Sequence, residues 1–397
     1  MARTFGIPFF QLLRQPALAK SIRLLNTIFR LPPPATKTST TTRSWIEQSR
    51  SEGCEHREIF PAGKIERKLP RSIDEQPHWH FRKFQTVNTP PVFLAKIPQG
   101  HVIGKYGSVV TKDGTILGDV SREWFFGPEQ HSLLFKLKSP PPQKISGTTV
   151  TLAMPSGWNY YHWLVDVLPR LAILEMAGVD IHSIDSFAVN AGDAPFQKES
   201  LEILGIPASK RIPVSAESHY VCEKLVVPSP VGLSSDTPKW AVEFLRRKLI
   251  PKTPSAKTPA RIYVSRSRSK YRIFTNETEV RAMLVGRGFE EVFTEQMTFR
   301  QQIELFANAS AMVAPHGAGL ANLLFCSRGA KVIEIFSPDY VNGCFWALAN
   351  WAELDYFYLL GAGPRPAEFY DPHRVEKDIT VDLKKLEQIL ALAEIRQ

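Results

Sequence analysis

Residues 311–335 read AMVAPHGAGLANLLFCSRGAKVIEI, and the fold prediction starts from this stretch. An apolar strand over 311–314 enters a turn with two glycines, a short apolar helix follows over 319–326, and a second strand covers 331–335. Strands that alternate with helices at these lengths predict βαβ units and a parallel sheet.

The same alternation continues on both sides of this stretch. Before it, the sequence predicts strand 261–265, helix 276–287, strand 291–293 and helix 298–308, and after it a helix near 341–352, strand 356–360 and helix 382–395. An earlier series predicts strands 150–153, 187–190 and 220–227, with helices 160–177 and 196–204 between them. Two helix starts have the spacing of a capping box, Asn276 with Glu279 and Thr298 with Gln301.

This pattern predicts two α/β domains in the chain of 397 residues, over 46–234 and 235–381, with helix 382–397 folding back across them. A hairpin around Lys112, Asp113 and Gly114 is expected in the poorly patterned part of the first domain. Residues 1–45 are expected to form a basic tail with a linker rich in Pro and Thr over 31–43.

The net charge of +10 lies mostly in residues 1–45, so it describes a basic tail and not a surface for nucleic acid. Residues 1–30 could form an amphipathic helix on anionic lipid, and a disordered basic tail is the alternative. No apolar run reaches the ~18 residues of a membrane-spanning helix. The four scattered cysteines have no zinc-site spacing. We therefore expect a cytoplasmic protein with reduced thiols, peripheral at the inner face of the membrane if the tail binds lipid.

The first candidate site is the turn PHGAG at 315–319, which contains Ala318 between two glycines. Gly317 and Gly319 would let backbone N–H groups approach a ligand, and the following helix N-terminus would offer donors to a phosphate. His316 would add a hydrogen-bond donor or a cation. The alternative is a tight strand-to-helix turn whose glycines serve packing.

The second candidate site is the run SRSRSKYR at 265–272, which leaves the first strand of the same sheet. Four cations with interleaved hydroxyls suit a pyrophosphate, although a charged loop exposed to solvent would have the same sequence pattern. Ligands of open parallel sheets bind at the carboxyl ends of the strands, and this position favours the anion site. Glu334 ends the strand after the glycine turn and could accept hydrogen bonds from ribose hydroxyls, or be capped by a neighbour.

A third motif, WNYYHWLVDVLPR, covers 158–170 and lies in the other half of the chain. On a continuous helix His162, Asp166 and Arg170 share one face, and a His/Asp pair can handle protons beside aromatic rings that stack on sugars. Pro169 would bend or end that helix. A satisfied core histidine is the alternative.

One absence also bears on the chemistry. The chain has no Asp-x-Asp motif, the carboxylate pattern that often holds Mn²⁺ or Mg²⁺ beside a diphosphate. Stabilisation of a leaving diphosphate would then depend on Arg, Lys and helix dipoles. We expect neither a metal nor a cofactor.

Three motifs, YYHWLVDVLPRL (160–171), SRSRSKYRIFTNE (265–277) and APHGAGLANLLF (314–325), together resemble glycosyltransferase family 61 over roughly 150–340. The resemblance implies a GT-B fold of two Rossmann-like halves facing a cleft, inversion at the anomeric carbon and no required metal. It implies that Arg266 and Arg272 hold the donor diphosphate and that the loop from His316 to Gly319 cradles nucleotide or phosphate. His162, Asp166, Asn159, Tyr160 and Arg170 would face sugar and acceptor, with Asp166 as general base and His162 as the alternative base.

The sequence therefore predicts an inverting, metal-independent glycosyltransferase. It would move a sugar from a nucleotide-sugar donor, expected to be UDP-linked, to a hydroxyl of a glycan or glycosylated acceptor, as in surface polysaccharide synthesis. An NAD-dependent oxidoreductase is one rival, because GAGLAN at 317–322 partly matches GxGxxG and Glu334 stands at the distance of a ribose-binding acid. The third glycine is missing, however, and the loop follows the third strand of its half. A non-catalytic nucleotide-binding scaffold at the membrane is the other rival.

Overall fold

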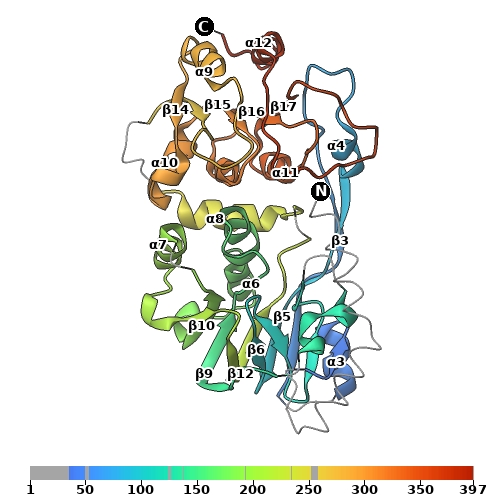
Figure 1. Ribbon diagram of the computed structural model, residues 1–397. Coiled ribbons are helices and arrows are strands. Elements are labelled where there is room, and N and C mark those ends of the chain that lie inside the picture. Colours follow the sequence, from blue (N-terminus) through green and yellow to red (C-terminus); the bar gives the residue numbers. More distant parts are fainter. Residues whose placement is uncertain are drawn as a thin grey trace. The chain divides into compact units, whose positions relative to one another are not determined.

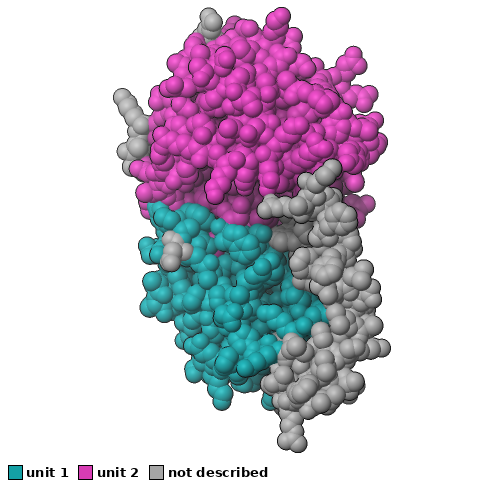
Figure 2. Space-filling model, in the orientation of Figure 1, with its two compact units in different colours: residues 1–61, 91–158, 166–231 teal, residues 62–90, 159–165, 232–397 magenta. Residues whose placement is uncertain are grey.

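The computed structural model describes residues 35–49, 53–123, 127–136, 138–192, 194–233, 235–251 and 258–396. The chain divides into two compact units, which Figure 2 distinguishes by colour. Unit 1 comprises residues 1–61, 91–158 and 166–231, and unit 2 comprises residues 62–90, 159–165 and 232–397. The predicted membrane contact through residues 1–30 lies outside the described residues. Within the described ranges, no helix has the length and apolar character needed to cross a bilayer.

Unit 1 is built on a mixed sheet that has ten strands in the described part of the chain. Eight of them follow the order β1-β8-β7-β6-β12-β9-β10-β11; in addition, β5 pairs with β12, and β2 pairs with β5. The strands are β1 (Lys37–Ser39), β2 (Glu55–Phe60), β5 (Val92–Pro98), β6 (His101–Ile103), β7 (Ser108–Val110), β8 (Thr115–Leu117), β9 (Gln143–Thr151), β10 (Ser186–Asn190), β11 (Arg211–Val214) and β12 (His219–Pro228). The helices are α3 (Thr42–Ser49), α6 (Arg170–Met176), α7 (Pro195–Ile203) and the 3₁₀ turns η1 (Pro128–Gln130), η2 (Ser132–Phe135), η4 (Ile181–Ser183) and η5 (Ala208–Lys210).

The parallel sheet predicted for this part of the chain is confirmed for four of the strands. β12, β9, β10 and β11 pair in parallel, whereas β5 and β6 run antiparallel to β12. The hairpin predicted around Gly114 is confirmed as β7 and β8. Part of the predicted linker 31–43 is regular structure instead, because β1 pairs with β8 and α3 begins at Thr42.

Unit 2 is built on a parallel sheet with five strands in the described residues, in the order β14-β13-β15-β16-β17. The strands are β13 (Arg261–Val264), β14 (Glu290–Val292), β15 (Ala311–Pro315), β16 (Lys331–Phe336) and β17 (Asp355–Leu360), and a separate antiparallel pair is formed by β3 (Gly63–Glu66) and β4 (Thr86–Thr89). The helices are α4 (Trp79–Lys83), α5 (Tyr160–His162), α8 (Lys239–Leu249), α9 (Glu277–Val285), η6 (Thr294–Gln296), α10 (Phe299–Asn308), η7 (Ala318–Phe325), α11 (Cys344–Trp351) and α12 (Leu383–Leu392). This α/β alternation confirms the strand and helix order predicted from the sequence.

Helices cover both faces of the five-stranded sheet (Figure 1). One buried apolar cluster joins α9 and α12 to alternate strand residues, among them Tyr263, Val313, Ile333 and Phe357. The other face carries α10, η7 and α11; η7 packs against both helices, and α11 packs on β17. α12 therefore packs on the sheet of unit 2, and burial on both faces explains why these strands are continuous apolar runs.

The strand order places a topological switch point between β13 and β15. Numbered along the chain the order is 2-1-3-4-5, and the chain connections leave the sheet in opposite directions from the first and third strands. Ligands of open α/β sheets bind outside the carboxyl ends of strands at such a point. The two loops singled out in the sequence, after β13 and after β15, both begin there.

Unit 2 also takes in residues 62–90, a segment that the continuous predicted domains 46–234 and 235–381 assign elsewhere. Main-chain bonds attach it to the edge of the sheet: Arg71 N donates to Tyr356 O at 3.1 Å, and Tyr358 N donates to Arg71 O at 3.0 Å. Phe81 in α4 is fully buried and packs edge-on against Trp346, with ring centroids 5.3 Å apart. These are contacts between residues far apart in the sequence, which a local pattern does not encode.

Two local predictions about helices were wrong. The helix predicted over 160–177 is α5, a π-helical turn (η3, Trp163–Val167) and α6, because Pro169 lacks the N–H that a continuous helix needs. Asn276 does not cap α9 with its side chain, which instead bonds the main chain of Val381 in both directions. The short helix predicted after the glycine turn is confirmed as η7, which is a 3₁₀ helix. The capping box of Thr298 and Gln301 is confirmed.

Candidate functional site

The loops after β13 and β15 meet at Arg266 and Gly317. A Cβ atom added to Gly317 would lie 3.0 Å from Cζ of Arg266 and closer still to its Nη1. Only a residue without a side chain leaves room for the guanidinium at this place. The two sequence motifs are therefore one site at the switch point.

Arg266 and Arg272 form a pair of cations on one tyrosine. Their guanidinium carbons lie 5.8 Å and 5.1 Å from the centroid of the Tyr271 ring, and Nη2 of Arg266 donates to the main-chain oxygen of Tyr271 at 3.1 Å. The pKa of Arg266 is lowered to about 10, chiefly by burial and next by the charge of Arg272. Cation–π contacts offset part of this repulsion but supply no negative charge.

The two arginines lack the partners that buried cations normally have. Nε of Arg266 and Nε of Arg272 are buried without a hydrogen-bond partner. Neither side chain forms a salt bridge with any carboxylate in the described ranges. Two like charges held together with free donors have the chemistry that suits an anion of more than one charge.

The backbone of Arg272 supports this interpretation. Its φ is +58°, in the left-handed region that non-glycine residues rarely occupy and that costs them roughly 1–2 kcal/mol. Strain of this kind persists where the surroundings over-determine it and often marks a binding site. Arg268 and Lys270, the other cations of the motif, are exposed, and Arg268 lies over Phe293 at 4.1 Å. The structure thus brings two of the four cations to the turn.

Tyr340 adds a third loop to the site, from the carboxyl end of β16. Its ring centroid lies 5.6 Å from the guanidinium carbon of Arg272 and 5.3 Å from the His316 ring. No sequence motif singles out Tyr340. Tyr340 follows a buried strand that lies next to β15 in the sheet, and this position at a strand end could have indicated it from the sequence.

His316 is buried at 3% exposure and bonds to Glu334 through Nδ1. Glu334 is fully buried, and its second carboxyl oxygen accepts a hydrogen bond from Tyr356. Burial raises the pKa of Glu334 to about 8, against the opposing effects of the Tyr356 hydrogen bond and the charge of Arg272. Burial, then Arg272 and Arg266, lowers the pKa of His316. Both shifts of pKa favour the uncharged form of the group concerned.

Glu334 therefore does not serve as the ribose acceptor expected from the sequence. Both of its oxygens are occupied and none of its surface is exposed, so a ribose hydroxyl has no access to it. The strand-end pattern shows where Glu334 stands but not which way its side chain turns. This correction also removes the acid on which the dehydrogenase alternative depended.

The glycine turn leads into η7, where Gly319 allows a close approach to Thr294, whose Oγ1 would lie 2.8 Å from an added Cβ. Ala318 and Gly319 are half-buried at the start of η7, which has no side-chain cap at Gly317. The Tyr160 hydroxyl donates to Oδ1 of Asn322 in η7 at 2.6 Å. Tyr160, assigned from the sequence to the sugar and acceptor side, thus contacts the helix of the predicted phosphate loop.

The remaining residues of the third motif occupy different environments. Asn159 is exposed, and its side chain accepts from Tyr161 N at 2.9 Å as the cap of α5. His162 is half-buried in unit 2, and Asp166 is 8% exposed in unit 1. A π-helical turn and Pro169 interrupt the continuous helix on which the predicted face of His162, Asp166 and Arg170 depended.

Arg170 is 1% exposed, and its guanidinium donates to Pro228 O and Ala153 O, each at 3.2 Å. Burial lowers the pKa of Arg170 to about 9, and the charge of Asp166 opposes this effect. Asp166 acts in the same way on Arg122, whose pKa burial also lowers. Asp166 is thus a counter-charge for two arginines in unit 1, and Arg170 is bound to the main chain and not presented to a ligand.

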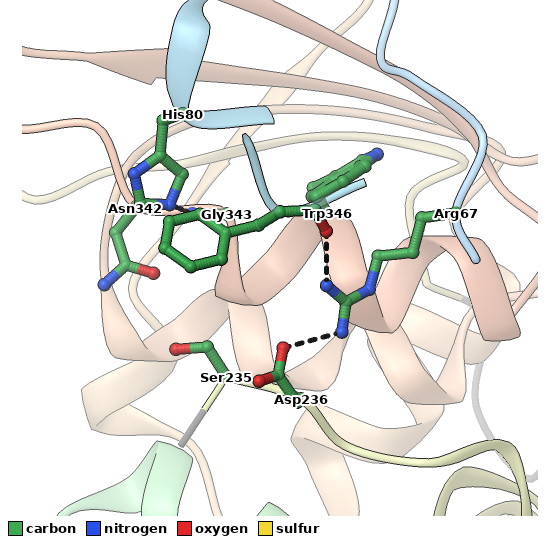
Figure 3. Close-up of a pocket in the computed structure, with 8 residues that line it drawn as sticks. Arg67, His80, Ser235, Asp236, Asn342, Gly343 and Trp346 are labelled. Carbon is green, nitrogen blue, oxygen red and sulfur yellow. Dashed lines mark hydrogen bonds and ion pairs between the residues drawn. The ribbon is translucent and has the colours of Figure 1, made fainter. Parts of the chain in front are cut away.

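A pocket of about 100 Å³ lies beside α11 in unit 2 and shares the loop of Tyr340 (Figure 3). It is lined by Arg67, His80, Phe84, Ser235, Asp236, Asn342, Gly343 and Trp346. Arg67 pairs with Asp236 at 2.8 Å, and Figure 3 shows Asn342 and Ser235 across the space from that guanidinium. His80 accepts from Gly343 N at 3.2 Å and contributes to the lowered pKa of His316. Aromatic walls with an amide, a hydroxyl and a carboxylate are chemistry that suits a sugar ring.

Among the described residues, no group of three or more His, Cys, Asp or Glu side chains is arranged to hold a metal ion. In the described part of the site, Arg266 and Arg272 are cations whose Nε donors lack partners and could face an anionic ligand.

In comparisons with known proteins, the three motifs fall within one match to a family model. Residues 160–333 match the model of a family described as Glycosyltransferase 61. The chain is 31% identical over 136 residues to the EGF domain-specific O-linked N-acetylglucosamine transferase of Drosophila melanogaster, covering 31% of this chain and 26% of that protein. It is 37% identical over 100 residues to protein O-linked-mannose beta-1,4-N-acetylglucosaminyltransferase 2 of Mus musculus, covering 23% of this chain and 17% of that protein. A beta-1,2-xylosyltransferase of Arabidopsis thaliana is 27% identical over 90 residues, covering 23% of this chain and 16% of that protein. The chain thus matches about a quarter or less of the length of these relatives.

Proposed function

We propose that this chain, whose residues 160–333 match the glycosyltransferase 61 family model, transfers a sugar from a nucleotide-sugar donor to a hydroxyl of a glycan or glycosylated acceptor. The donor in this proposal is UDP-linked, the reaction inverts the anomeric carbon, and no metal takes part. The GT-B architecture implied by the resemblance is part of the same proposal, as is a role in polysaccharide synthesis. The cytoplasmic location and a membrane contact through residues 1–30 stay predictions.

The observation that carries the proposal is the arginine pair at the switch point. Arg266 and Arg272 present buried Nε donors without partners, and Gly317 makes room for one of the two guanidiniums. A nucleoside diphosphate supplies adjacent negative groups of the spacing that two guanidiniums bind. The start of η7 beside Gly317 adds main-chain donors to the same place.

The reaction is a single displacement. A base accepts the proton of the acceptor hydroxyl, whose oxygen bonds to the anomeric carbon while the bond from that carbon to the diphosphate breaks. Arg266, Arg272 and the start of η7 then stabilise the negative charge on the leaving nucleoside diphosphate. We assign the base to Asp166, with His162 as the alternative, and Asp166→Asn and His162→Ala distinguish them by which variant loses kcat while UDP affinity persists.

The pocket of Figure 3 is proposed to receive a sugar ring. Phe84 and Trp346 supply apolar walls, and Asn342, Ser235 and Asp236 supply hydrogen-bonding groups. A sugar presents apolar faces and ring hydroxyls, which such a set recognises. Asn342→Ala is expected to raise KM for sugar substrates and to leave the affinity for UDP unchanged.

A thermal-shift screen with UDP, GDP, CMP, NAD and UDP-sugars, in the presence of EDTA, tests the donor site. A ligand that binds only the folded state raises the melting temperature by mass action. We expect a shift with UDP or a UDP-sugar in the wild type and in the exposed-cation control Arg268→Ala, and none in Arg266→Ala. A shift with NAD alone would favour the oxidoreductase. UDP binding without turnover of any sugar would favour the scaffold.

A further inference from the structure

The buried carboxyl group of Glu334 is a titratable group that the proposed displacement does not use. We propose that Glu334 is a positioning residue that fixes which nitrogen of His316 carries hydrogen, so that Nε2–H donates to the diphosphate of the donor while Glu334 holds its proton. The role of His316 rests on the proposed nucleotide-sugar site. The tautomer itself depends only on the protein.

The contacts of Glu334 leave a single arrangement for its proton. Oε2 accepts from the Tyr356 hydroxyl, so an uncharged Glu334 carries its hydrogen on Oε1, which faces Nδ1 of His316. The side chain is 0% exposed, and this burial keeps bulk solvent from competing for either oxygen. Glu334 then donates to Nδ1, and a neutral imidazole must carry its own hydrogen on Nε2.

Ionisation of Glu334 reverses this arrangement. A carboxylate only accepts hydrogen bonds, so Nδ1 must then carry the hydrogen, and Nε2 presents a lone pair. Nε2 has no hydrogen-bond partner in the described residues, and the ring lies close enough to Arg272 and Arg266 for both charges to lower the pKa of His316. One proton on Glu334 therefore decides whether His316 attracts or repels an anion held by the arginines.

The groups that face this pair come from five segments besides its own strands. They are Arg266 and Arg272 in the loop after β13, His80 in α4, Tyr340 in the loop after β16, Cys344 at the start of α11, and Tyr356 in β17. Burial raises the pKa of Tyr356 and Cys344 well above their usual values, burial also raises that of Tyr340, and burial lowers that of His80 to about 4. Between pH 6.5 and 9 the titrating group of the set is Glu334, whose pKa burial raises to about 8.

Glu334→Gln is the decisive variant because a glutamine copies the protonated carboxyl group at every pH. Its amide NH₂ can donate to Nδ1 of His316 while its oxygen accepts from Tyr356. We expect the affinity of the wild type for UDP, measured by calorimetry, to fall about tenfold or more from pH 7 to pH 9. The affinity of Glu334→Gln should stay level over that range, and Glu387→Gln, the same chemical change at an exposed position of α12, should behave like the wild type.

Tyr356→Phe supplies a second variant. The Tyr356 hydrogen bond lowers the pKa of Glu334, so its removal should move the fall in affinity to higher pH. A purely structural role for Glu334 would instead lower affinity by the same factor at every pH.

Nitrogen NMR of histidine-labelled protein without ligand reads the tautomer directly, with the His316 signal assigned by its loss in His316→Ala. We expect hydrogen on Nε2 at pH 6.5 and on Nδ1 at pH 9 in the wild type, and on Nε2 at both values in Glu334→Gln. A wild-type tautomer that does not change, or an equal pH dependence of UDP affinity in wild type and Glu334→Gln, would overturn the inference. A tautomer that changes as expected in a protein that binds UDP at no pH would overturn the proposed donor site and leave the tautomer assignment standing.

Discussion

The guanidinium group of Arg266 occupies the space that a side chain at position 317 would fill. Gly317 follows β15, and Arg266 follows β13, its neighbour in the sheet. The extended backbone of Gly317, with φ of −175°, suits any residue, so the requirement for glycine comes from the arginine and not from the turn. This contact joins the two loops of the proposed anion site.

Gly317→Ala should separate binding from stability. The atoms that its methyl group would displace belong to the end of a flexible side chain, so we expect a loss of stability of about 1 kcal/mol or less. The guanidinium must move, and we expect UDP affinity to fall at least tenfold, measured by calorimetry. Gly127→Ala, where an added Cβ meets nothing within 4 Å, is the control and should change neither quantity.

Arg272→Asn tests the strained cation. Asparagine tolerates left-handed backbone, so relief of strain should offset the lost cation–π contacts with Tyr271 and Tyr340, each worth about 0.5–1 kcal/mol. We expect an unchanged or higher melting temperature and a large loss of UDP affinity. Arg268→Asn removes the same charge from an exposed position and should keep that affinity. Retained UDP binding in Arg272→Asn would contradict the arginine pair as the diphosphate site.

Arg170→Met should act on stability and not on donor binding. The variant leaves the carbonyl groups of Pro228 and Ala153 without their donor, and each buried group left unpaired costs about 1–3 kcal/mol. We expect a clear fall in melting temperature and unchanged UDP affinity of the folded protein. Arg57→Met removes an exposed donor to the Ala177 carbonyl and should cost much less. A stable Arg170→Met protein that had lost kcat would show that Arg170 acts in the reaction instead.

The stability of the protein should depend on Glu334 in alkaline solution. Burial raises its folded pKa to about 8 from the ordinary 4.5, so between these values the folded state keeps a proton that the unfolded chain releases. Stability contributed by this group is therefore present below about pH 4.5 and is lost as the pH rises to about 8. The melting temperature of Glu334→Gln, which does not titrate, should gain on the wild type steadily from pH 5 to pH 8. A constant difference would contradict the raised pKa.

Removal of divalent ions should leave the reaction intact. In the proposed site Arg266 and Arg272 supply the positive charge that a metal would otherwise provide to the leaving diphosphate. We expect the same initial rate with EDTA as with added Mg²⁺ or Mn²⁺, measured as UDP release from a UDP-sugar. A rate that disappears with EDTA and returns with Mn²⁺ would contradict a metal-independent transfer.

Part of the candidate site could be predicted from the sequence because its positions are local. The loops of Arg266, Arg272 and Gly317 stand directly after apolar strands, and strand ends in a parallel sheet gather at one edge. Glu334 was found by the same rule, but its role was not, because the partners that occupy its carboxyl group come from β15 and β17. Tyr340 also follows the end of a strand, but neither Tyr340 nor His80 belongs to a motif with a recognisable spacing.

The sequence by itself determined the order of strands and helices from β13 to β17, because hydrophobic periodicity and turn residues are patterns of neighbouring positions in the chain. Only the tertiary structure decided that residues 62–90 belong to unit 2, that Arg272 adopts left-handed backbone and that a π-helical turn separates His162 from Arg170. It alone decided that Glu334 faces His316 and Tyr356. These features depend on which side chains are buried against one another across long separations in the chain, and burial sets both the pairing of a polar group and its charge.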